Sequence, residues 1–578
     1  MMKKTYVKEG FYMKSSKSKI ATIFSIVCLA LATMVFGVFA LVSVPNQTQG
    51  TLSYIQKICY VQRTDAEDKY FSSIDKAYTY SKNGDTINIF QNATLTDDLA
   101  ISKNLTLSAV QNAVTLNTQS NEISISSSAS LRIGGSAYAL NITSSQAPAI
   151  QNNGLLTLAS GANISSISTT LQTAGTSTAG IFVESGYTPS STIQLIISGT
   201  PTVGAQVAYC QDAQDASALV DVLKLSNQSY YLYAQGNSIL IAEAVVINET
   251  LQRGYSDLSS AIAESEAGNV LDVVKNVSTD TVYAIPHSLT IKTDTTAGVQ
   301  VDGAFNISTG TLTLGSGTGT LTINNYVQAS GGNVDALSGS TIVGGECSLS
   351  DGSQMVVGIY NSQSGSVTVS GASVGATLSG VVGVINYTNG SVTVENGSTI
   401  GNSNGVYGIM SSGGTISVTG GQVIGGSADQ MVGILLADLS VGTGASLSVS
   451  GGSINGYYGI MNGMLGGTSK VQVSGTAQIL GSYAAIHNSS TAADSLVVQG
   501  GTIGSTSSTY GIYNAANASI QGGNIIAAES SGSVGIQNEN GTLSITGGNI
   551  SGDYGIQNGT DSGTSTGRVV VSGTTTEI

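Results

Sequence analysis

Apolar and polar residues alternate in short segments over the second half of the chain. One such segment is Ser446-Leu-Ser-Val-Ser-Gly-Gly-Ser-Ile454, and similar segments occupy 366–374, 542–550 and 568–573. Apolar side chains at every second position, bounded by Gly, Ser and Asn, are typical of a β-strand that buries one face. The pattern predicts many short strands, each with an apolar and a polar face.

A tetrapeptide of the type Gly-Ile-x-Asn recurs between these segments. Its nine copies begin at Gly358, Gly383, Gly408, Gly433, Gly459, Ala485, Gly511, Gly535 and Gly555. Successive copies are 20 to 26 residues apart, and most steps are 25 or 26. A nearly fixed step of this length, filled by short strands, predicts a parallel β-solenoid in which each repeat forms one turn.

Each position of the tetrapeptide has a predicted role. We expect Ile to face the core and the third residue, which varies among Tyr, Met, Gln and His, to face outward. Glycine permits a bend before Ile, and Asn hydrogen-bonds the backbone at the end of the strand. Stacked turns would align these asparagines into an internal ladder of Asn361, Asn386, Asn462, Asn488, Asn514, Asn538 and Asn558.

Over roughly residues 70–578 the chain resembles the right-handed parallel β-helix proteins of the pectin-lyase-like superfamily. It looks most similar to their non-enzymatic, repeat-rich bacterial surface members. The resemblance implies an all-β fold, a right-handed parallel β-helix. The repeat is specific for the fold and carries little information about activity.

A helical stripe of apolar residues precedes the strands twice, within 70–80 and within 255–262. The same offset of 184 residues relates these stripes (255 and 71) and the two strands that follow each of them (268 and 84, 285 and 101). The first turn of a solenoid needs a cap, because it would otherwise expose its core and a strand edge. The common offset therefore predicts two modules, each with its own N-terminal cap. In the first and less regular module, Ala149-Ile-Gln-Asn152 is of the tetrapeptide type.

The segment between the two modules, 204–249, departs from the repeat. Ala213 to Leu225 predicts a short amphipathic helix, and 230–241 predicts a hairpin that turns at Gly236-Asn237. We expect a small α+β insert. Its Tyr230, Tyr231 and Tyr233 could stack on a sugar, although strand packing is the commoner role of such residues.

The N-terminal segment predicts export. Residues 1–19 carry six lysines, and 20–44 is free of charge. This stretch is longer than the ~7–15 apolar residues of a secretory signal and long enough for a membrane span of ~20. A retained anchor is favoured and a cleaved signal stays open. In either case the basic flank would remain cytoplasmic and the bulk of the chain would lie outside the cell.

These expectations divide the chain into six segments. They are a cytoplasmic basic segment (1–19), a signal anchor or signal peptide (20–44), a spacer with one strand at Tyr54 to Val61 (45–69), the first capped module (70–203), the insert (204–249) and the second module (250–578). The sequence stops right after a strand, with no capping segment, so we expect the second module to belong to a longer surface protein.

Charge and cysteine content exclude several functions. The net charge is −15, and 301–578 contains 13 acidic residues against two basic ones, so this surface should not attract nucleic-acid phosphates. The cysteines Cys28, Cys59, Cys210 and Cys347 are isolated and lack metal-ligand spacing, which predicts free or buried thiols.

The two histidines, His287 and His487, are not expected to bind a metal. His487 occupies an outward tetrapeptide position, where we expect a surface residue. His287 aligns with Lys103 of the first cap, in a turn that we expect to be solvated. No cofactor or metal ion is predicted.

Catalytic constellations are not evident. β-Helix enzymes that cleave polysaccharides use clustered carboxylates, and glycoside hydrolysis needs two acids ~5–9.5 Å apart. The acids of the second module occur singly, among them Asp351, Glu395, Asp429, Asp438, Asp494 and Asp553. Two Gly-x-Ser-x-Gly matches, at 371–375 and 401–405, lie in expected strands and loops rather than in a strand–turn–helix context. No residue is assigned a catalytic, cofactor-binding or metal-binding role.

We therefore expect an exported, cell-surface structural or adhesin-like protein without catalytic activity. Its partners would be the membrane, through the N-terminal helix, and a cell-surface glycan or a host or neighbouring cell. The binding surface would be the outward positions Tyr360, Met410, Met461 and Tyr513, which equally fit inert packing. The alternative is a polysaccharide lyase or glycoside hydrolase for extracellular glycans, whose acids converge from different turns.

Overall fold

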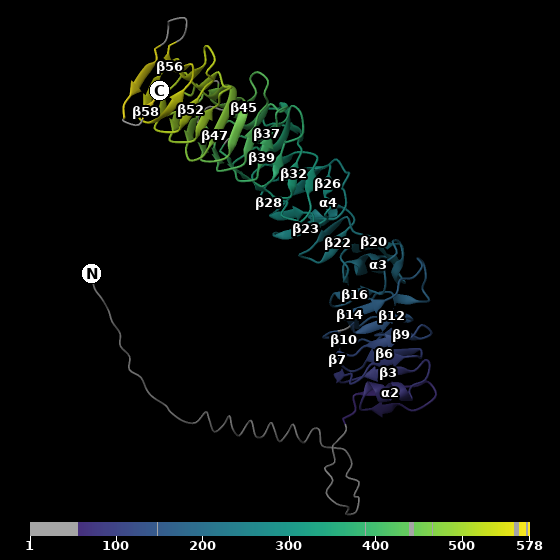
Figure 1. Ribbon diagram of the computed structural model, residues 1–578. Helices are drawn as coiled ribbons and strands as arrows, with labels where there is room; N and C mark the ends of the chain where they lie inside the picture. Colours follow the sequence, from purple (N-terminus) through teal and green to yellow (C-terminus); the bar gives the residue numbers. More distant parts are fainter. Residues whose placement is uncertain are drawn as a thin grey trace, which may run out of the picture. The chain divides into compact units, whose positions relative to one another are not determined.

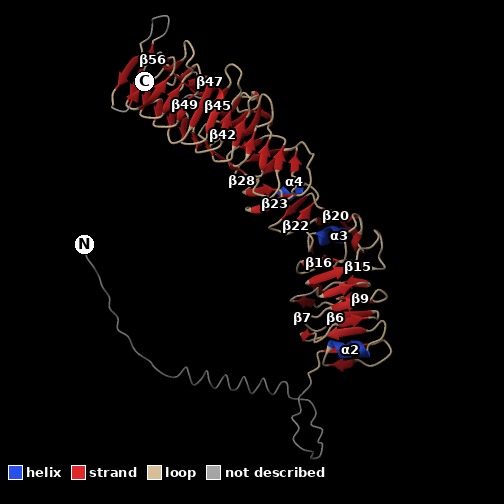
Figure 2. Cartoon of the chain, in the orientation of Figure 1, coloured by secondary structure: helices blue, strands red, loops and turns tan. Residues whose placement is uncertain are grey.

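The computed structural model describes residues 56–146, 148–387, 389–437, 444–464, 466–559, 566–573 and 576–578. Within these residues the chain forms a parallel β-solenoid of about 19 turns (Figure 1). The same residues form three short helices, α2 (Ile74–Tyr80), α3 (Ala213–Val220) and α4 (Leu258–Ala263), shown in blue in Figure 2. The predicted solenoid is confirmed.

The turns fall into two sets that share no sheet. In the set nearer the N-terminus, sheet A has the order β19-β20-β17-β15-β12-β9-β6-β3-β1-β2, and two further sheets of four and six strands complete the turns. The bounds in sheet A are β1 (Cys59–Gln62), β2 (Lys69–Phe71), β3 (Thr86–Ile89), β6 (Leu105–Ala109), β9 (Ser130–Ile133), β12 (Leu155–Leu158), β15 (Gly180–Val183), β17 (Gln206–Cys210), β19 (Tyr230–Gln235) and β20 (Ser238–Glu243).

The second set consists of sheet D, which has 15 strands, and sheet E, which has 23. The alternating Ser/Thr segments form strands of sheet D, namely β35 (Ser366–Ser370), β38 (Ser391–Val394), β41 (Thr415–Val418), β44 (Ser446–Val449), β46 (Lys470–Val473), β48 (Leu496–Val498), β51 (Ala518–Ile520), β54 (Thr542–Ile545) and β57 (Arg568–Val571). The tetrapeptides end strands of sheet E, namely β34 (Gln354–Asn361), β37 (Val382–Asn386), β40 (Tyr407–Ser411), β43 (Val432–Ala437), β45 (Ser453–Met464), β47 (Gln478–Asn488), β50 (Tyr510–Asn514), β53 (Val534–Asn538) and β56 (Tyr554–Asn558).

Each set begins with the same arrangement of elements. In the first, β1 pairs antiparallel with both β2 and β3, and α2 lies between β2 and β3 in the chain. In the second, β21 (Val246–Asn248) pairs antiparallel with both β22 (Arg253–Tyr255) and β23 (Asn269–Val273), and α4 lies between them in the chain. Each helix has a side-chain N-cap, Ser73 or Asp257, and buries its apolar stripe. The offset of 184 residues therefore relates equivalent elements.

Lys103 and His287 do occupy equivalent positions, but His287 does not lie in a solvated turn. Lys103 Nζ donates to the carbonyl oxygens of Tyr78 and Ser81 at 2.9 and 2.8 Å. His287 is half-buried, and its Nε2 donates to the Ser265 carbonyl oxygen at 2.7 Å. Both side chains thus donate to carbonyl oxygens at or just beyond the C-terminal end of a cap helix.

The segment 204–249 matches its predicted elements with one correction. The hairpin β19–β20 is confirmed, and β20 also pairs with β17, so it extends sheet A. The expected helix ends at Val220 instead of Leu225, because β18 (Leu223–Leu225) pairs with β16 (Ile193–Ile197). The strand expected at Tyr54 to Val61 appears as β1, which begins at Cys59. No helix in the described part of the chain is long and apolar enough to cross a membrane, and the predicted anchor at 20–44 lies outside that part.

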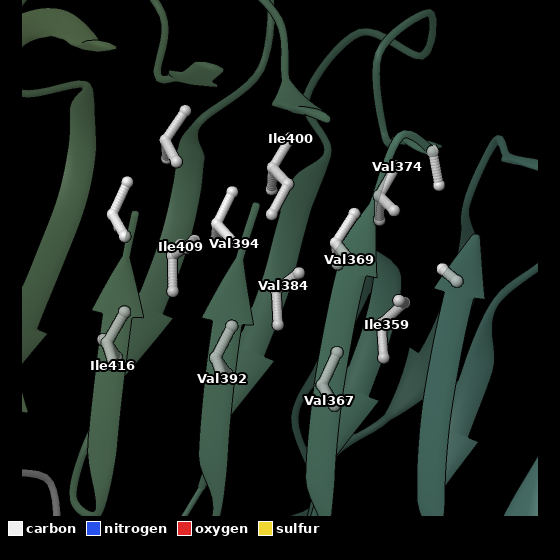
Figure 3. Close-up of a cluster of buried hydrophobic side chains, with 14 of the residues drawn as sticks. Ile359, Val367, Val369, Val374, Val384, Val392, Val394, Ile400, Ile409 and Ile416 are labelled. Atoms are coloured by element: carbon white, nitrogen blue, oxygen red, sulfur yellow. The ribbon is translucent and has the colours of Figure 1, made fainter. Parts of the chain in front are cut away.

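The interior of the second set consists of aligned rows of Val and Ile, one residue per turn (Figure 3). Val367, Val392 and Ile416 are register partners in β35, β38 and β41, and each is 1% exposed. Full burial of such a side chain contributes about 1.5–3 kcal/mol. Every turn therefore packs on its neighbours, and an apolar inward residue, mostly Val, Ile or Leu, occupies each step.

The predicted asparagine ladder is present and has two sections. Asn361 Nδ2 donates to Asn386 Oδ1 at 2.9 Å, and Asn386 then meets Ser411. After an interruption at Leu436, a longer section runs from Asn462 to Asn558. In this section the side-chain Nδ2 of each asparagine donates to Oδ1 of the next one along the ladder, at 2.7–2.8 Å, through Asn488, Asn514 and Asn538. The first member of each section, Asn361 or Asn462, has a buried Oδ1 with no donor among the residues that the structure describes, because Ala329 or Leu436 precedes it in the register.

Candidate functional site

The third residue of the tetrapeptide faces away from the solenoid core, as predicted. The isoleucines Ile359 and Ile460 belong to the main apolar core, whereas Tyr360 and Met461 belong to separate small clusters on the outer side of sheet E. The inside–outside assignment of the tetrapeptide is therefore confirmed. How accessible each outward side chain is depends on what covers it.

Tyr360 is not an accessible binding position. It is 1% exposed, because β33 (Gly345–Ser348) forms an antiparallel hairpin with β34 that places Cys347 and Leu349 against it. The Tyr360 hydroxyl also bonds the backbone N–H and the hydroxyl of Ser350, at 3.0 and 2.6 Å. The Asp351-Gly352 pair between two short strand patterns was the available sequence signal for this hairpin.

Six aromatic side chains form a continuous cluster on the outer side of β45, β47 and β50. This cluster, here called the aromatic surface, comprises Tyr457, Tyr458, Tyr483, His487, Tyr510 and Tyr513. Two pairs of rings from neighbouring turns lie parallel. The ring centroids of Tyr457 and Tyr483 are 5.3 Å apart, and those of His487 and Tyr513 are 5.1 Å apart.

The remaining contacts in the aromatic surface are edge-on and join the two parallel pairs. Tyr458 meets Tyr483 and His487 with centroids 5.4 and 5.7 Å apart. Tyr510 meets Tyr483 and Tyr513 at 5.3 and 5.4 Å. All six side chains are half-buried. The rings therefore fix one another while each keeps part of its surface open to solvent.

The local backbone explains why the aromatic surface lies at these turns. A neighbouring turn contributes two separate strands to sheet E, for example β49 (Thr502–Gly504) and β50, with a loop between them. In β45 and β47 the corresponding two segments form a single continuous strand. Each long strand bends at a glycine. A Cβ on Gly456 or Gly481 would lie 2.4 or 2.0 Å from a backbone carbonyl oxygen further along the same strand. The tyrosines follow directly after these bends.

The aromatic surface is uncharged, with carboxylates nearby. Tyr513 donates to Glu539 Oε2 at 2.6 Å, and its pKa is raised by burial and by this hydrogen bond. Burial, and then the charge of Asp429, raise the pKa of Tyr457. Lys470 and Arg568, the two basic residues of 301–578, lie on β46 and β57 of sheet D, and the aromatic surface lies on sheet E.

The structure corrects the expectation for His487. Instead of a freely exposed side chain it is half-buried between Tyr458 and Tyr513, and its Nδ1 is buried without a hydrogen-bond partner in the described part of the chain. Burial lowers the pKa of this imidazole, although Glu539 acts in the opposite direction. His487 is thus neutral at physiological pH and serves as one of the rings.

Sequence reasoning placed Tyr513 and Met461 correctly but missed four tyrosines of the aromatic surface. Tyr457, Tyr458, Tyr483 and Tyr510 precede the tetrapeptides rather than occupying their third position. The signal that could have found them is the recurrence of tyrosine one or two residues before the tetrapeptide in three successive repeats. These strands begin before the tetrapeptide, so the repeat of the tetrapeptide alone does not include the tyrosines.

One cluster of three acids occurs among the described residues, and it was also missed. Carboxylate oxygens of Glu249, Asp272 and Asp294, one turn apart in sequence, lie within 4.8 Å of one another. Lys292 Nζ lies 3.0 Å from Glu249 and 2.5 Å from Asp294. Burial raises the pKa of Asp272, whereas the hydrogen bond from Lys292 lowers that of Asp294. The lysine occupies the position that a cation would need, so the cluster is a charge-paired network.

The described cysteines are inert. Cys59, Cys210 and Cys347 are free and buried, as the sequence predicts, and burial raises the pKa of Cys59 and Cys210 to about 12. A thiol with so high a pKa is not nucleophilic at neutral pH. Cys28 and Asp438 lie outside the described residues.

Neither a protein-family model, nor a curated protein, nor a solved structure matches this chain.

Proposed function

We propose that this chain is an exported, adhesin-like cell-surface protein that binds a cell-surface glycan through its aromatic surface. In this proposal the fold is a right-handed β-helix of two capped modules, and residues 20–44 attach it to the membrane. The observation that carries the proposal is the set of six contiguous, half-exposed rings on successive turns.

The chemistry of the aromatic surface fits a sugar chain. Successive turns repeat at ~4.8 Å, so the part-exposed rings offer a row of apolar surface along the solenoid. Tyrosine pairs such a face with a polar hydroxyl group, and the rings are held by one another, so little side-chain entropy is lost on binding. A sugar presents apolar C–H faces and hydroxyl groups in the same way.

The charge distribution favours a neutral or weakly charged glycan and disfavours nucleic acid as a partner. Asp429 and Glu539 influence the pKa values of the rings, and both basic residues of 301–578 lie on sheet D. A polyanion would be repelled by the carboxylates and would find no cation on this side. The proposed ligand is therefore neutral or weakly charged.

The alternative function is a polysaccharide lyase or glycoside hydrolase. Such an enzyme needs two carboxyl groups about 5–9.5 Å apart across an open site. At the aromatic surface Glu539 is hydrogen-bonded to Tyr513, and the one described cluster of three acids contains Lys292. These pairings favour binding over hydrolysis.

Glycan-array binding of the purified full chain tests the proposal. Tyr483→Ala removes the ring that contacts three others, and binding to the recognised neutral glycans should fall about tenfold or more, as for loss of a central aromatic anchor. Tyr138→Ala is the matched control, because Tyr138 is 43% exposed and lies outside the aromatic surface. Equal binding by both variants would contradict the proposal, and release of reducing ends from a bound glycan would favour the hydrolase.

A further inference from the structure

A hollow lies on the outer face of sheet A, in the first set of turns. It has a volume of about 480 Å³, within the range of ligand-binding pockets. Its floor consists of outward residues from four successive strands, and Thr106, Arg132, Thr157 and Phe182 form one row across β6, β9, β12 and β15. We call this hollow the sheet A groove.

An ion pair lies along the sheet A groove. Arg132 reaches across the β12 turn to Glu184, and its Nε and one terminal nitrogen donate to the two carboxylate oxygens at 2.6 Å each. The pair is accessible, because the side chains of Arg132 and Glu184 are 36% and 30% exposed. This bidentate geometry fixes both groups in one plane.

The backbone next to Arg132 is shaped to hold the guanidinium. Its other terminal nitrogen donates to the Gly134 carbonyl oxygen at 3.3 Å. A Cβ on Gly135 would lie 2.1 Å from that nitrogen, so only glycine leaves room for the guanidinium in this position. Gly135 also has a φ of +85°, which other residues rarely adopt. The position of Arg132 is therefore set by the fold.

We propose that the sheet A groove binds a short neutral saccharide, independently of the aromatic surface. The paired Arg132 and Glu184 have no net charge, so they offer donors and acceptors to hydroxyl groups without attracting a charged ligand. Phe182, whose ring stacks on that of Tyr209 with centroids 6.3 Å apart, supplies a half-exposed apolar face beside them. Hydroxyl groups of Thr106, Ser130 and Ser177 complete the lining.

The sheet A groove is a binding site rather than a catalytic one. Among the described residues that line it, Glu184 is the single carboxylate. Hydrolysis of a glycosidic bond requires a second acid, and Glu184 is moreover held by Arg132. The groove can therefore orient a sugar but has no pair of groups for proton transfer.

Isothermal titration and saturation-transfer NMR of the purified full chain test this proposal. The probes are maltotetraose, mannotetraose and tetra-N-acetylchitotetraose, with tetragalacturonate as the acidic comparison. We expect saturable binding of at least one neutral tetraose and weaker binding of tetragalacturonate. Phe182→Ala and Arg132→Ala should each weaken that binding about tenfold or more, since each removes one central contact.

Control variants separate this site from the rest of the molecule. Arg253→Ala breaks a similar exposed pair, with Glu264 at 2.8 Å, and should leave the affinity unchanged. Thr106→Trp fills the sheet A groove from the neighbouring strand and leaves Arg132 and Glu184 in the sequence, so it should abolish binding even if Arg132→Ala does not fold. Tyr483→Ala should not alter tetraose binding, and this separates the two proposed sites.

Three results would overturn the proposal. They are the absence of binding by every neutral tetraose, a preference for tetragalacturonate, and an affinity that Phe182→Ala and Thr106→Trp leave unchanged.

Discussion

The two sets of turns both enclose an apolar interior, but they satisfy their buried polar groups differently. The first set closes each turn with three separate sheets, and its one buried tetrapeptide asparagine, Asn152, bonds the Gly180 carbonyl oxygen and Thr169 without an asparagine partner. The second set carries the asparagine ladder, and its continuous strands β45 and β47 join neighbouring strand columns within sheet E. The comparison shows that the regular set stacks identical polar side chains in register, with interruptions at Ser411 and Leu436, whereas the less regular set satisfies its asparagine with other groups.

The outer faces differ in a corresponding way. Regular turns align their outward side chains, and in β45, β47 and β50 this alignment produces the contiguous rings of the aromatic surface. The less regular first set instead has a polar row in which Arg132 spans two turns to reach Glu184. The two proposed binding sites thus lie in sets of turns that repeat with different strictness.

The largest expected effect comes from breaking the ladder at its centre. Asn488→Ala removes the acceptor of Asn462 and the donor to Asn514 and Ser495, all of them buried. Each unpaired buried group costs ~1–3 kcal/mol, so the free energy of unfolding should fall by about 3 kcal/mol. Denaturant unfolding followed by circular dichroism measures this change.

Asn152→Ala and Asn558→Ala are the matched comparisons. Asn152 has no asparagine partner among the described residues, so its removal should cost about 1–2 kcal/mol. Asn558, which is exposed at the last described tetrapeptide, should cost less than ~1 kcal/mol. If all three substitutions cost the same, the ladder has no cooperative role and the distinction between the two sets of turns fails.

Sequence periodicity alone predicts the fold of the second set, but it does not predict the two proposed binding sites. The Gly-Ile-x-Asn step identifies the turns, the inward Ile and the ladder, because these features depend on residues that repeat. The cover over Tyr360 and the burial of His487 depend on an inserted hairpin and on neighbouring rings, which have no period. The pairing of Arg132 with Glu184 spans 52 residues in the irregular set, where no register can be predicted from spacing.

A smaller loss of stability is expected from substituting the glycine that precedes Ile in the tetrapeptide. A Cβ on Gly433 would lie 2.6 Å from the Gly459 carbonyl oxygen and from a methyl group of Ile454. Gly433→Ala should therefore cost about 1–3 kcal/mol of unfolding free energy through overpacking. The equivalent residue Ala485 shows that one turn accommodates a methyl group, and it is 0% exposed.

Ala485→Gly provides the control, since it relieves no overlap in the native strand. It should destabilise by only about 0.5–1 kcal/mol, through the entropy of the unfolded chain. A Gly433→Ala variant as stable as the parent chain would show that the glycine column reflects sequence repetition rather than steric need.

The smallest expected effect is a pH dependence of the free energy of unfolding, and it compares a residue on the outer face with a residue in the interior. His487 is half-buried and its pKa is lowered, first by burial, so the folded chain binds a proton less readily than the unfolded chain. The contribution of His487 to stability is therefore fully present above the unfolded-state pKa of ~6.5. This contribution is lost as the pH falls through that value towards the lower pKa of the folded state. The denaturation midpoint of the second set should decrease between about pH 7.5 and pH 5.5 for this reason.

His487→Gln keeps a polar side chain but cannot be protonated, so that part of the pH dependence should disappear. At pH 7.5 the same variant should lose roughly 1 kcal/mol or less, the contribution of its stacking on Tyr513. Asn488→Ala, one residue away but inside the solenoid, should keep the full pH dependence of the parent chain at a lower overall stability. If His487→Gln instead costs as much as Asn488→Ala, the outer face contributes as much to folding as the ladder, and the regularity of these turns needs a cause beyond their interior.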